Sequence, residues 1–466
     1  MKAVERRGRS LLALRCLVPL GGLACALPGH AEVTFEPSVA AGVAHTDNLT
    51  LVAVDPEPET VYELIPSFGL RQRGARMSSD IHYRAEGYYY ANRSDSSVYQ
   101  IYNADFLSAL DPGNFFLGFG ASRDQTISDP ASPIPRTNLP ISTNRIDRDD
   151  YYVGPNFQYR VGSDLTLHGN YKRTRTHYGK SETGALLVPE YDTDATAFSV
   201  DNYRKERGFT WAVDYSGDRT DYGELFPTWE YRHAGVEVGA WVGKGARFYA
   251  SAGKESPWDD PFDASLKDTF SEVGFTKRVG RDFSVDLAAG ERSFGSSRRA
   301  SLNYTFLHGQ TQLSYSEQPA TQGRMPTDYL TRPGAAERFI LKRFDWGFGV
   351  RLLRTEVSFS IYDETREQRT SIDGTPLDDQ AQSGGTFVAT WHVGVKTAFS
   401  LGAEDLNQKF SAGSSQDLRS VWIAASRTLG PRTNLGLTVT RGDSQTGNAQ
   451  NDYKANLISL LLTRKL

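Results

Sequence analysis

The sequence predicts an all-β chain that closes into a transmembrane, antiparallel up-and-down β-barrel of about 18–22 strands. Three observations support this fold class. Apolar and polar residues alternate along strand-length stretches, short turns alternate with long polar connections, and an apolar strand ends at the carboxyl terminus. A soluble β-propeller is the alternative fold, because its blades repeat at a similar length, but its loops would be short on both faces.

The final stretch contains no turn residue after Asn456. An apolar strand at a chain end leaves an unpaired edge, which the first strand covers in a closed barrel. Residues 35–44 have a matching apolar side and are predicted to be that first strand. The residues predicted to close the barrel and to form the signal read by the barrel-assembly machinery are Ile458, Leu460, Leu462 and Leu466.

Residues 1–31 have the pattern of a cleaved signal peptide. A basic segment with Lys2, Arg6 and Arg7 precedes an apolar stretch, and small residues lead to a predicted cleavage site after Ala31. The predicted domains are therefore 1–31, the signal peptide, and 32–466, the barrel. A retained anchor helix is the alternative, although the segment is short for one.

Cleavage at this site changes the chemistry of the mature chain. Both cysteines, Cys16 and Cys25, are removed, which excludes disulfides, thiol catalysis and cysteine-bound metals. The segment carries five basic residues and one acidic residue, so the net charge falls from −4 to about −8. A chain this acidic is not an electrostatic partner of nucleic acids.

Strand-length stretches alternate as expected for a wall between lipid and water. Ile81 and Tyr83 alternate with His82 and Arg84. The same alternation recurs in residues 35–44, 165–172 and 283–288. A helical period of 3.6 residues would not place charges at every second position. A polar lumen also accounts for the mean hydropathy of −0.48.

Two kinds of connection alternate along the chain. Short turns are predicted at residues 73–75, 111–114, 161–164, 207–208, 242–245, 279–282, 308–309, 393–396 and 429–432. Longer polar connections are predicted at about 46–60, 129–144, 180–190, 256–266, 319–336, 367–381 and 410–416. This asymmetry is typical of outer-membrane barrels, which have short periplasmic turns and long extracellular loops.

Tryptophans near predicted strand ends suit the aromatic girdle of a membrane interface, whereas a soluble core would place them in mid-strand. The girdle candidates are Trp211, Trp229, Trp241, Trp346, Trp391 and Trp422.

Several segments resemble one family of outer-membrane proteins, those associated with PEP-CTERM/exosortase systems of exopolysaccharide-producing Gram-negative bacteria. The similar segments are FEPSV at 35–39, HTDNL at 45–49, ELIPSFGL at 63–70 and ASRTLGP at 425–431. The resemblance implies a porin-type β-barrel linked to exopolysaccharide, with no catalytic residues. The chain departs from the family at its end, where such barrels usually carry an aromatic residue and this chain has Leu466.

No motif for nucleotide binding, serine hydrolysis or zinc hydrolysis occurs, so the sequence predicts no enzyme, cofactor or metal site. A barrel enzyme at the rim is a remote alternative, for which His177 with Asp192 or Asp194 is the candidate. Acidic groups in the long loops, such as Asp259 and Asp260, are interpreted as solvated charge and not as Ca²⁺ ligands.

Polar residues on the inward side of the strands mix charges with aromatic and amide groups, which suit sugars and anionic polymers. The predicted lumen-lining residues are His82, Arg84, Glu86, Asn170, Lys172 and Arg204, with Tyr88 or Tyr203 beside them. The segment 319–336, with Pro326 and Pro333, is long enough to fold into the lumen.

The sequence thus predicts a porin-like protein for passage or export across the outer membrane, and the resemblance implies exopolysaccharide as the solute. The predicted partners are outer-membrane lipid and lipopolysaccharide, the barrel-assembly machinery, and exopolysaccharide or its export apparatus. The alternative is a non-conducting structural anchor of a surface polysaccharide or PEP-CTERM system.

Overall fold

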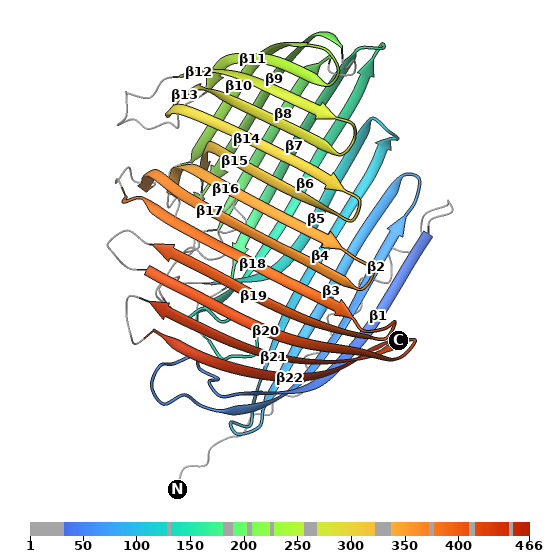
Figure 1. Ribbon diagram of the computed structural model, residues 1–466, viewed down its shortest axis with the longest axis vertical. Helices are drawn as coiled ribbons and strands as arrows, with labels where there is room; N and C mark the ends of the chain where they lie inside the picture. Colours follow the sequence, from blue (N-terminus) through green and yellow to red (C-terminus); the bar gives the residue numbers. More distant parts are fainter. Residues whose placement is uncertain are drawn as a thin grey trace.

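The computed structural model is a closed wall of antiparallel strands around a lumen (Figure 1). The predicted signal peptide, 1–31, and the predicted lumen residue Arg204 lie outside the residues that it describes. The described residues are 32–127, 132–142, 144–179, 190–202, 207–223, 228–255, 268–321, 337–371, 377–409, 415–446 and 451–466. Among these residues no helix is long and apolar enough to cross a membrane.

Within these described ranges the wall has 22 strands, which confirms the predicted fold class. In chain order they are β1 (Glu32–Thr46), β2 (Glu59–Arg73), β3 (Met77–Tyr90), β4 (Asp95–Asp111), β5 (Phe115–Ile127), β6 (Arg145–Val161), β7 (Leu165–Tyr178), β8 (Tyr191–Asp201), β9 (Gly208–Asp221), β10 (Trp229–Trp241), β11 (Ala246–Glu255), β12 (Thr269–Val279), β13 (Phe283–Arg292), β14 (Gly295–Phe306), β15 (Gly309–Thr321), β16 (Glu337–Arg351), β17 (Thr355–Ser371), β18 (Gln380–His392), β19 (Thr397–Lys409), β20 (Ser415–Gly430), β21 (Thr433–Thr446) and β22 (Tyr453–Lys465).

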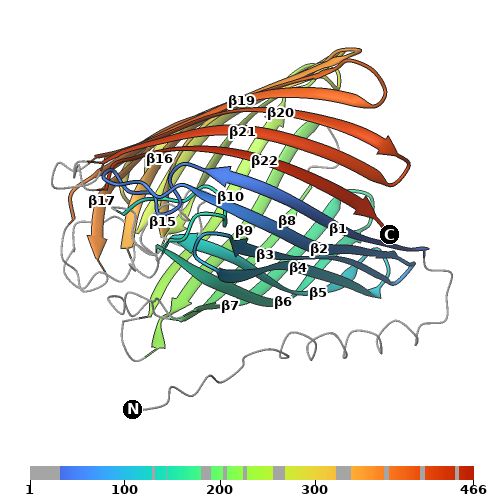
Figure 2. The same cartoon turned by 90° about the horizontal axis from the view of Figure 1, so that it is seen from below.

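The last strand pairs with the first, which closes the barrel and leaves no open sheet edge. The pairing runs from Ser38 opposite Lys465 to Thr46 opposite Leu457. Figure 2 shows β1 and β22 side by side, next to the carboxyl terminus. The prediction that an apolar first strand covers an apolar closing strand is therefore confirmed for these residues.

Every predicted short turn joins two strands at the end of the barrel where the chain terminates. Gly113 and Gly162 have φ angles of 89° and 65°, which explains why glycine marks these turns. The predicted alternation is wrong at two connections on the opposite side. Residues 91–94 and 293–294 are short there, because Ser94 (φ 54°) and Gly295 (φ 118°) reverse the chain at once.

The outer face carries an apolar band with a sharp polar boundary. In β5, β7, β11, β13, β15, β17, β19 and β21 an outward-facing charge follows the first residue of the strand by eight positions. These residues are Arg123, Arg173, Lys254, Glu291, Glu317, Asp363, Asp405 and Arg441. Between these charges and the short turns lie exposed apolar side chains such as Phe119, Ile361 and Leu401.

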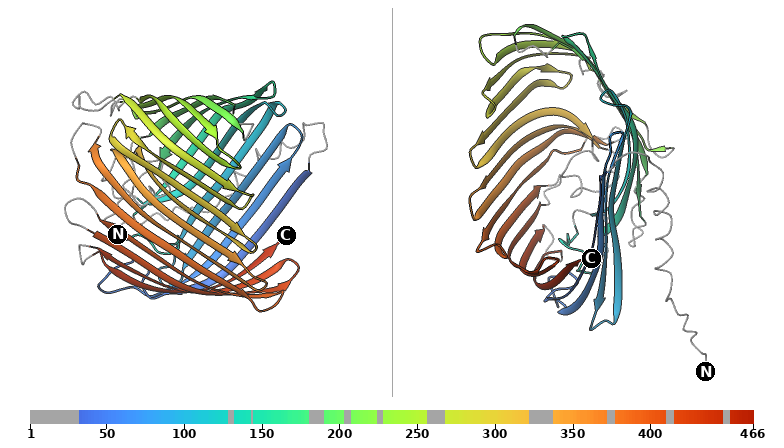
Figure 3. Two further views of the ribbon diagram at one scale, coloured as in Figure 1. Left: turned by 45° about the horizontal axis from the view of Figure 1, so that its top comes forward. Right: turned by 90° about the vertical axis from the view of Figure 1, so that its right-hand side faces the viewer.

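The height of this band matches a membrane. Eight residues of strand span about 26 Å, and the strands cross the wall obliquely (Figure 3). A tilt of about 40° reduces this length to about 20 Å along the membrane normal, which is close to the apolar band of outer-membrane barrels. The eight-residue spacing therefore places the membrane on the turn-side part of the wall.

The tryptophans divide between the two faces of the wall. Trp346 and Trp391 are exposed on the outer face and contact Phe359 and Phe399, as expected for a girdle. The girdle prediction is wrong for Trp422, which alternates with the outward Val421 and Ile423. Its ring faces the lumen because Gly402 on the neighbouring strand leaves room for it. Trp229 and Trp241 also lie on the inner side of their strand.

Candidate functional site in the barrel lumen

The predicted lumen residues of β3 lie on the inner face, where they form a line of charges. His82 Nε2 lies 2.7 Å from Asp80, and Arg84 forms an ion pair of 2.8 Å with Glu86. Glu86 is only 7% exposed. A buried carboxylate needs donors to replace its water, and the two that complete its shell come from the wall and from a loop.

Those donors are Tyr88 and Asn138. The Tyr88 hydroxyl donates to Glu86 at 3.0 Å, and the Asn138 side-chain amide donates to the same carboxylate at 2.8 Å. Asn138 belongs to the connection between β5 and β6. Glu86 therefore ties the strand wall to a segment that has left the rim and entered the lumen.

The described part of this segment, residues 132–142, is called the inward loop below. Its Arg136 forms an ion pair with Glu404 of β19, and Arg145 at the start of β6 donates hydrogen bonds to Asn138 and to the carbonyl oxygen of Pro135. Each contact replaces part of the water shell of a charged group. The loop is thus held by charged contacts at both of its sides.

Tyrosines fix the backbone of the inward loop. The Tyr90 hydroxyl donates to the carbonyl oxygen of Leu139 at 3.1 Å, and the Tyr453 hydroxyl donates to that of Ile134 at 2.6 Å. Tyr453 belongs to β22, which forms the closing seam with β1, and Tyr90 belongs to β3, two strands from β1. Hydroxyl donors from the wall thereby satisfy carbonyls that the loop has taken out of water.

Two apolar side chains anchor the same loop. Ile134 (5% exposed) packs among Leu51, Ile127, Leu406, Leu418 and Tyr453. Leu139 (3% exposed) packs in a second cluster with Ala44, Leu49, Val61, Tyr88 and Tyr90. Full burial of such a side chain contributes about 1.5–3 kcal/mol. The loop is therefore a packed part of the structure.

A cavity of about 670 Å³ lies beneath the inward loop. Its walls carry positive and negative side chains, and hydroxyl groups from β21 and β22 line the opposite wall. The lining residues include Glu63, Arg84, Glu86, Arg136, Glu404, Thr438, Thr440 and Ser459. Such a lining hydrogen-bonds a polar solute without strongly selecting one sign of charge.

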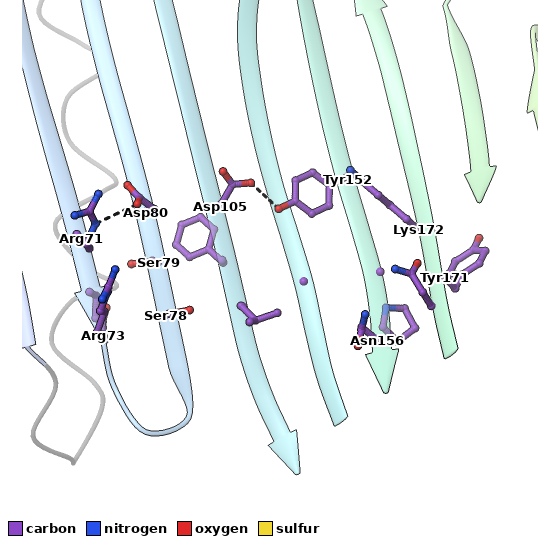
Figure 4. Close-up of a pocket in the computed structure, with 17 residues that line it drawn as sticks. Arg71, Arg73, Ser78, Ser79, Asp80, Asp105, Tyr152, Asn156, Tyr171 and Lys172 are labelled. Atoms are coloured by element: carbon purple, nitrogen blue, oxygen red, sulfur yellow. Dashed lines mark hydrogen bonds and ion pairs between the residues drawn. The ribbon is translucent and has the colours of Figure 1, made fainter. Parts of the chain in front are cut away.

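A second cavity, of about 500 Å³, lies nearer the turn side of the barrel, on the wall formed by β2 to β7. The predicted residues Asn170 and Lys172 line it (Figure 4). Lys172 Nζ lies 4.3 Å from the ring centre of Tyr152, whose hydroxyl donates to Asp105 at 2.6 Å. Asn156 lies directly opposite Asn170 on the neighbouring strand. We refer to this cavity as the trough.

The wall from β16 to β20 has a different chemistry in its turn-side half. Hydroxyl pairs occur there, Ser360 with Thr386 at 2.8 Å and Thr390 with Ser400 at 2.9 Å, beside the ion pair of Arg351 and Glu356 at 2.7 Å. The lumen therefore has one side lined mainly by charged groups and another side on which hydroxyl pairs accompany an ion pair. A solute in the lumen can bond to both sides with different groups.

The remaining predicted residues also have defined places. Ile458, Leu460, Leu462 and Leu466 are exposed on the outer face by 42–63%, and their role as an assembly signal stays a prediction. His177 bonds Glu190 on the outer face, and Asp192 pairs with Arg173. Within the described residues no group of three metal-binding side chains converges.

Sequence reasoning missed the inward loop and its partners Arg136, Asn138 and Glu404. The segment chosen instead, 319–336, lies mainly outside the described residues. A signal was present in three prolines, Pro133, Pro135 and Pro140, which favour a fixed extended path over a hairpin. The lumen residues of β3 and β7 were visible because they alternate with apolar neighbours.

Fold and lumen together define the class of outer-membrane β-barrels. Neither a protein-family model nor a curated protein sequence matches this chain. Among solved structures, a variant of the ferric enterobactin receptor PfeA of Pseudomonas aeruginosa has a TM-score of 0.51 at 9% identity, covering 95% of this chain and 81% of that one. At this identity the likeness extends to the fold alone.

Two further solved structures have lower TM-scores. The siderophore receptor PirA of Acinetobacter baumannii has a TM-score of 0.49 at 8% identity, covering 93% of this chain and 81% of its own. OpdO of Pseudomonas aeruginosa has a TM-score of 0.36 at 12% identity, covering 93% of this chain and 97% of its own.

Proposed function

We propose that this barrel is a channel through which polar solutes cross the outer membrane. The observation that carries the proposal is the lumen itself, since the strands of the wall enclose a space lined by ion pairs and by paired hydroxyls. Barrels of this size are wide enough for an aqueous path unless something fills them. The inward loop narrows this path. It is a connection between two strands of the wall, and the described residues form no separate plug domain.

A polymer of sugars is the proposed solute. The resemblance to barrels of PEP-CTERM systems implies exopolysaccharide, and the lumen chemistry is compatible with it. Sugar hydroxyls can bond to the serine and threonine wall, and aromatic faces such as that of Tyr152 can contact sugar rings. Passage would be passive, because the lumen replaces the water shell of the solute group by group.

The test of the polymer proposal is secretion by the producing cell. Deleting the gene should abolish extracellular polysaccharide, and the full chain should restore it. A variant whose lumen is blocked, with the barrel still folded in the outer membrane, should fail to restore it. Restoration by the blocked variant would contradict export through the lumen.

A non-conducting anchor is the second candidate. The observation in its favour is the packing of the inward loop, which holds the lumen narrow with two buried apolar anchors and an ion pair. Uptake of a small neutral sugar into liposomes separates the two candidates. A channel makes the liposomes swell, whereas an anchor leaves them unchanged.

A further inference from the structure

The turn-side rim of the barrel is strongly basic. Many of its short connections place a lysine or arginine at their tip, exposed to solvent. These tips are Arg76, Lys244, Arg281, Arg354, Lys396 and Arg432. None of the six forms an ion pair with another described residue. The described part of the rim therefore carries a ring of cations that form no ion pair, although Asp111, Asp164 and Asp282 lie in or beside turns of the same rim.

The opposite end of the barrel has the opposite charge. Its described connections are rich in acidic residues, namely Asp47, Asp55, Glu57, Asp378, Asp379 and Asp452. The two arginines there, Arg93 and Arg136, are paired with Glu57 and Glu404. The chain has a net charge of −4, so the basic ring is a local feature that the overall composition conceals.

The basic ring continues into the lumen along the trough. Arg73 is the last residue of β2, three residues before Arg76, and Lys172 lies on the far side of the same cavity (Figure 4). Neither side chain forms an ion pair with a described residue. Arg73 and Lys172 are thus two cations of the trough that face the lumen without an ion pair.

The acidic groups of the trough are already engaged. Asp80 is 3.2 Å from Arg71, and Asp105 accepts a hydrogen bond of 2.6 Å from Tyr152. Asn156 and Asn170 add amide donors between the two cations. Asp105 keeps its charge, but the three cations of the trough, Arg71, Arg73 and Lys172, outnumber its two carboxylates, and together with the amides they favour carboxylates or sulfates.

The spacing of the cations indicates a ligand with repeated charges. Arg73 on β2 and Lys172 on β7 are separated by five strand steps, or about 24 Å. One carboxylate cannot reach both, whereas a chain of charged units can. Since opposite charge in a confined space raises the local concentration of a ligand, the ring would collect such a chain and the trough would hold it.

We propose that the basic ring and the trough bind a polyanionic glycan, a polysaccharide bearing carboxylates, which enters the lumen from the turn side. The inference rests on the proposed channel function and names its substrate class and direction. Membrane lipid is a competing source of negative charge. The basic residues that face lipid form a different set, Lys277, Arg427 and Arg464, which permits a matched control.

The test uses the full mature barrel in a planar bilayer and two probes of equal length, oligogalacturonate and a neutral malto-oligosaccharide. The anionic probe should block the current when it is added on the turn side. This block should be about tenfold stronger than the block by the same probe added on the loop side, and about tenfold stronger than the block by the neutral probe. Because screening shortens the reach of charge, block should weaken at 1 M salt.

Variants assign the block to residues. A triple variant, Arg73→Gln, Arg76→Gln and Lys172→Gln, should weaken the block about tenfold. A control variant removes the same charge from the lipid face through Lys277→Gln, Arg427→Gln and Arg464→Gln. The anionic probe should block this variant as strongly as it blocks the wild type. Equal block by both probes, or equal loss in both variants, would overturn the proposal.

Calorimetry in detergent separates this inference from the channel proposal. Binding of oligogalacturonate that the lumen variant loses, without any conductance, would support the basic site and refute the channel. Conductance without such binding would refute the basic site and leave the channel intact.

Discussion

Single carboxylates control the state of the inward loop. Glu86 accepts from Arg84, Tyr88 and Asn138, and Glu404 faces Arg136. Charge-assisted hydrogen bonds of this kind are the stronger ones in a protein. The position of the loop therefore depends on a few acidic side chains of the wall, which can be changed one at a time.

Glu404→Gln should loosen the loop, because a neutral amide cannot balance the Arg136 guanidinium. Since the pair is partly exposed, the loss is about 1 kcal/mol, which corresponds to roughly fivefold more frequent local opening. Trypsin cleavage after Arg136 in the folded, detergent-solubilised barrel measures that opening.

The neighbouring residue is the matched control for this change. Asp405 points outward and pairs with Arg419 at 3.0 Å, so Asp405→Asn removes the same charge without touching the loop. Trypsin should cut this variant as slowly as the wild type. Equal acceleration in both variants would show that the ion pair with Arg136 does not hold the loop.

At the scale of elements, the closing seam is the most constrained part of the wall. A Cβ atom added to Gly42 would lie 2.5 Å from the carbonyl oxygen of Leu460 and 2.8 Å from the Leu461 side chain. At Gly436, on the neighbouring strand pair, the nearest atom is 3.9 Å away. The two glycines therefore differ in how closely the backbones must approach.

Gly42→Val should destabilise the barrel by about 1–3 kcal/mol, as overpacking does elsewhere. The loss of the heat-resistant, fast-migrating form on SDS gels at a lower temperature measures it. Gly436→Ala has ordinary contact distances and should melt like the wild type. If both variants melt with the wild type, the seam tolerates a side chain and the packing described for β1 and β22 is wrong.

Deleting residues 457–466 should prevent closure, because it removes the partner of both β1 and β21. The expected product is unfolded and degraded in the cell. Leu466→Phe, by contrast, should preserve or improve assembly, since it restores the usual aromatic end. A heat-modifiable, protease-resistant barrel from the truncated chain would contradict the account of closure.

The strands and their turns could be predicted because both depend on local chemistry. Alternation at every second residue marks a wall with two different sides, and glycines with positive φ mark the turns. The short connection at 91–94 was not predicted because its residue with positive φ is Ser94 and not a glycine.

The inward loop could not be predicted because its partners are remote in sequence. Arg136 meets Glu404, and Ile134 meets Tyr453, across hundreds of residues. No periodicity connects such positions. Trp422 was misplaced for a similar reason, since only the glycine opposite it, Gly402, makes room for its ring inside the lumen.

At the scale of the whole molecule, charge is arranged along two directions. Around the lumen, the ion pairs of β3 contrast with a region of β17 to β19 in which hydroxyl pairs lie beside an ion pair. Along the barrel axis, basic turns face acidic loops. Both follow from the fold, because antiparallel strands bring turns that are distant in sequence to one rim. These two asymmetries give the lumen a direction as well as a lining.

The most direct measurement of the central claim is single-channel conductance in planar bilayers. The claim is that the lumen is an aqueous path narrowed by the inward loop. The wild-type barrel should give discrete steps. A variant in which residues 133–142 are replaced by a short glycine–serine linker should give steps several-fold larger, with the barrel shown to be folded by its heat-modifiable migration.

Two results would contradict this claim. Steps of equal size in both proteins would show that the inward loop does not narrow the path. A folded barrel that gives no steps in either form would show that the lumen does not conduct, and the anchor would then be the function of this protein.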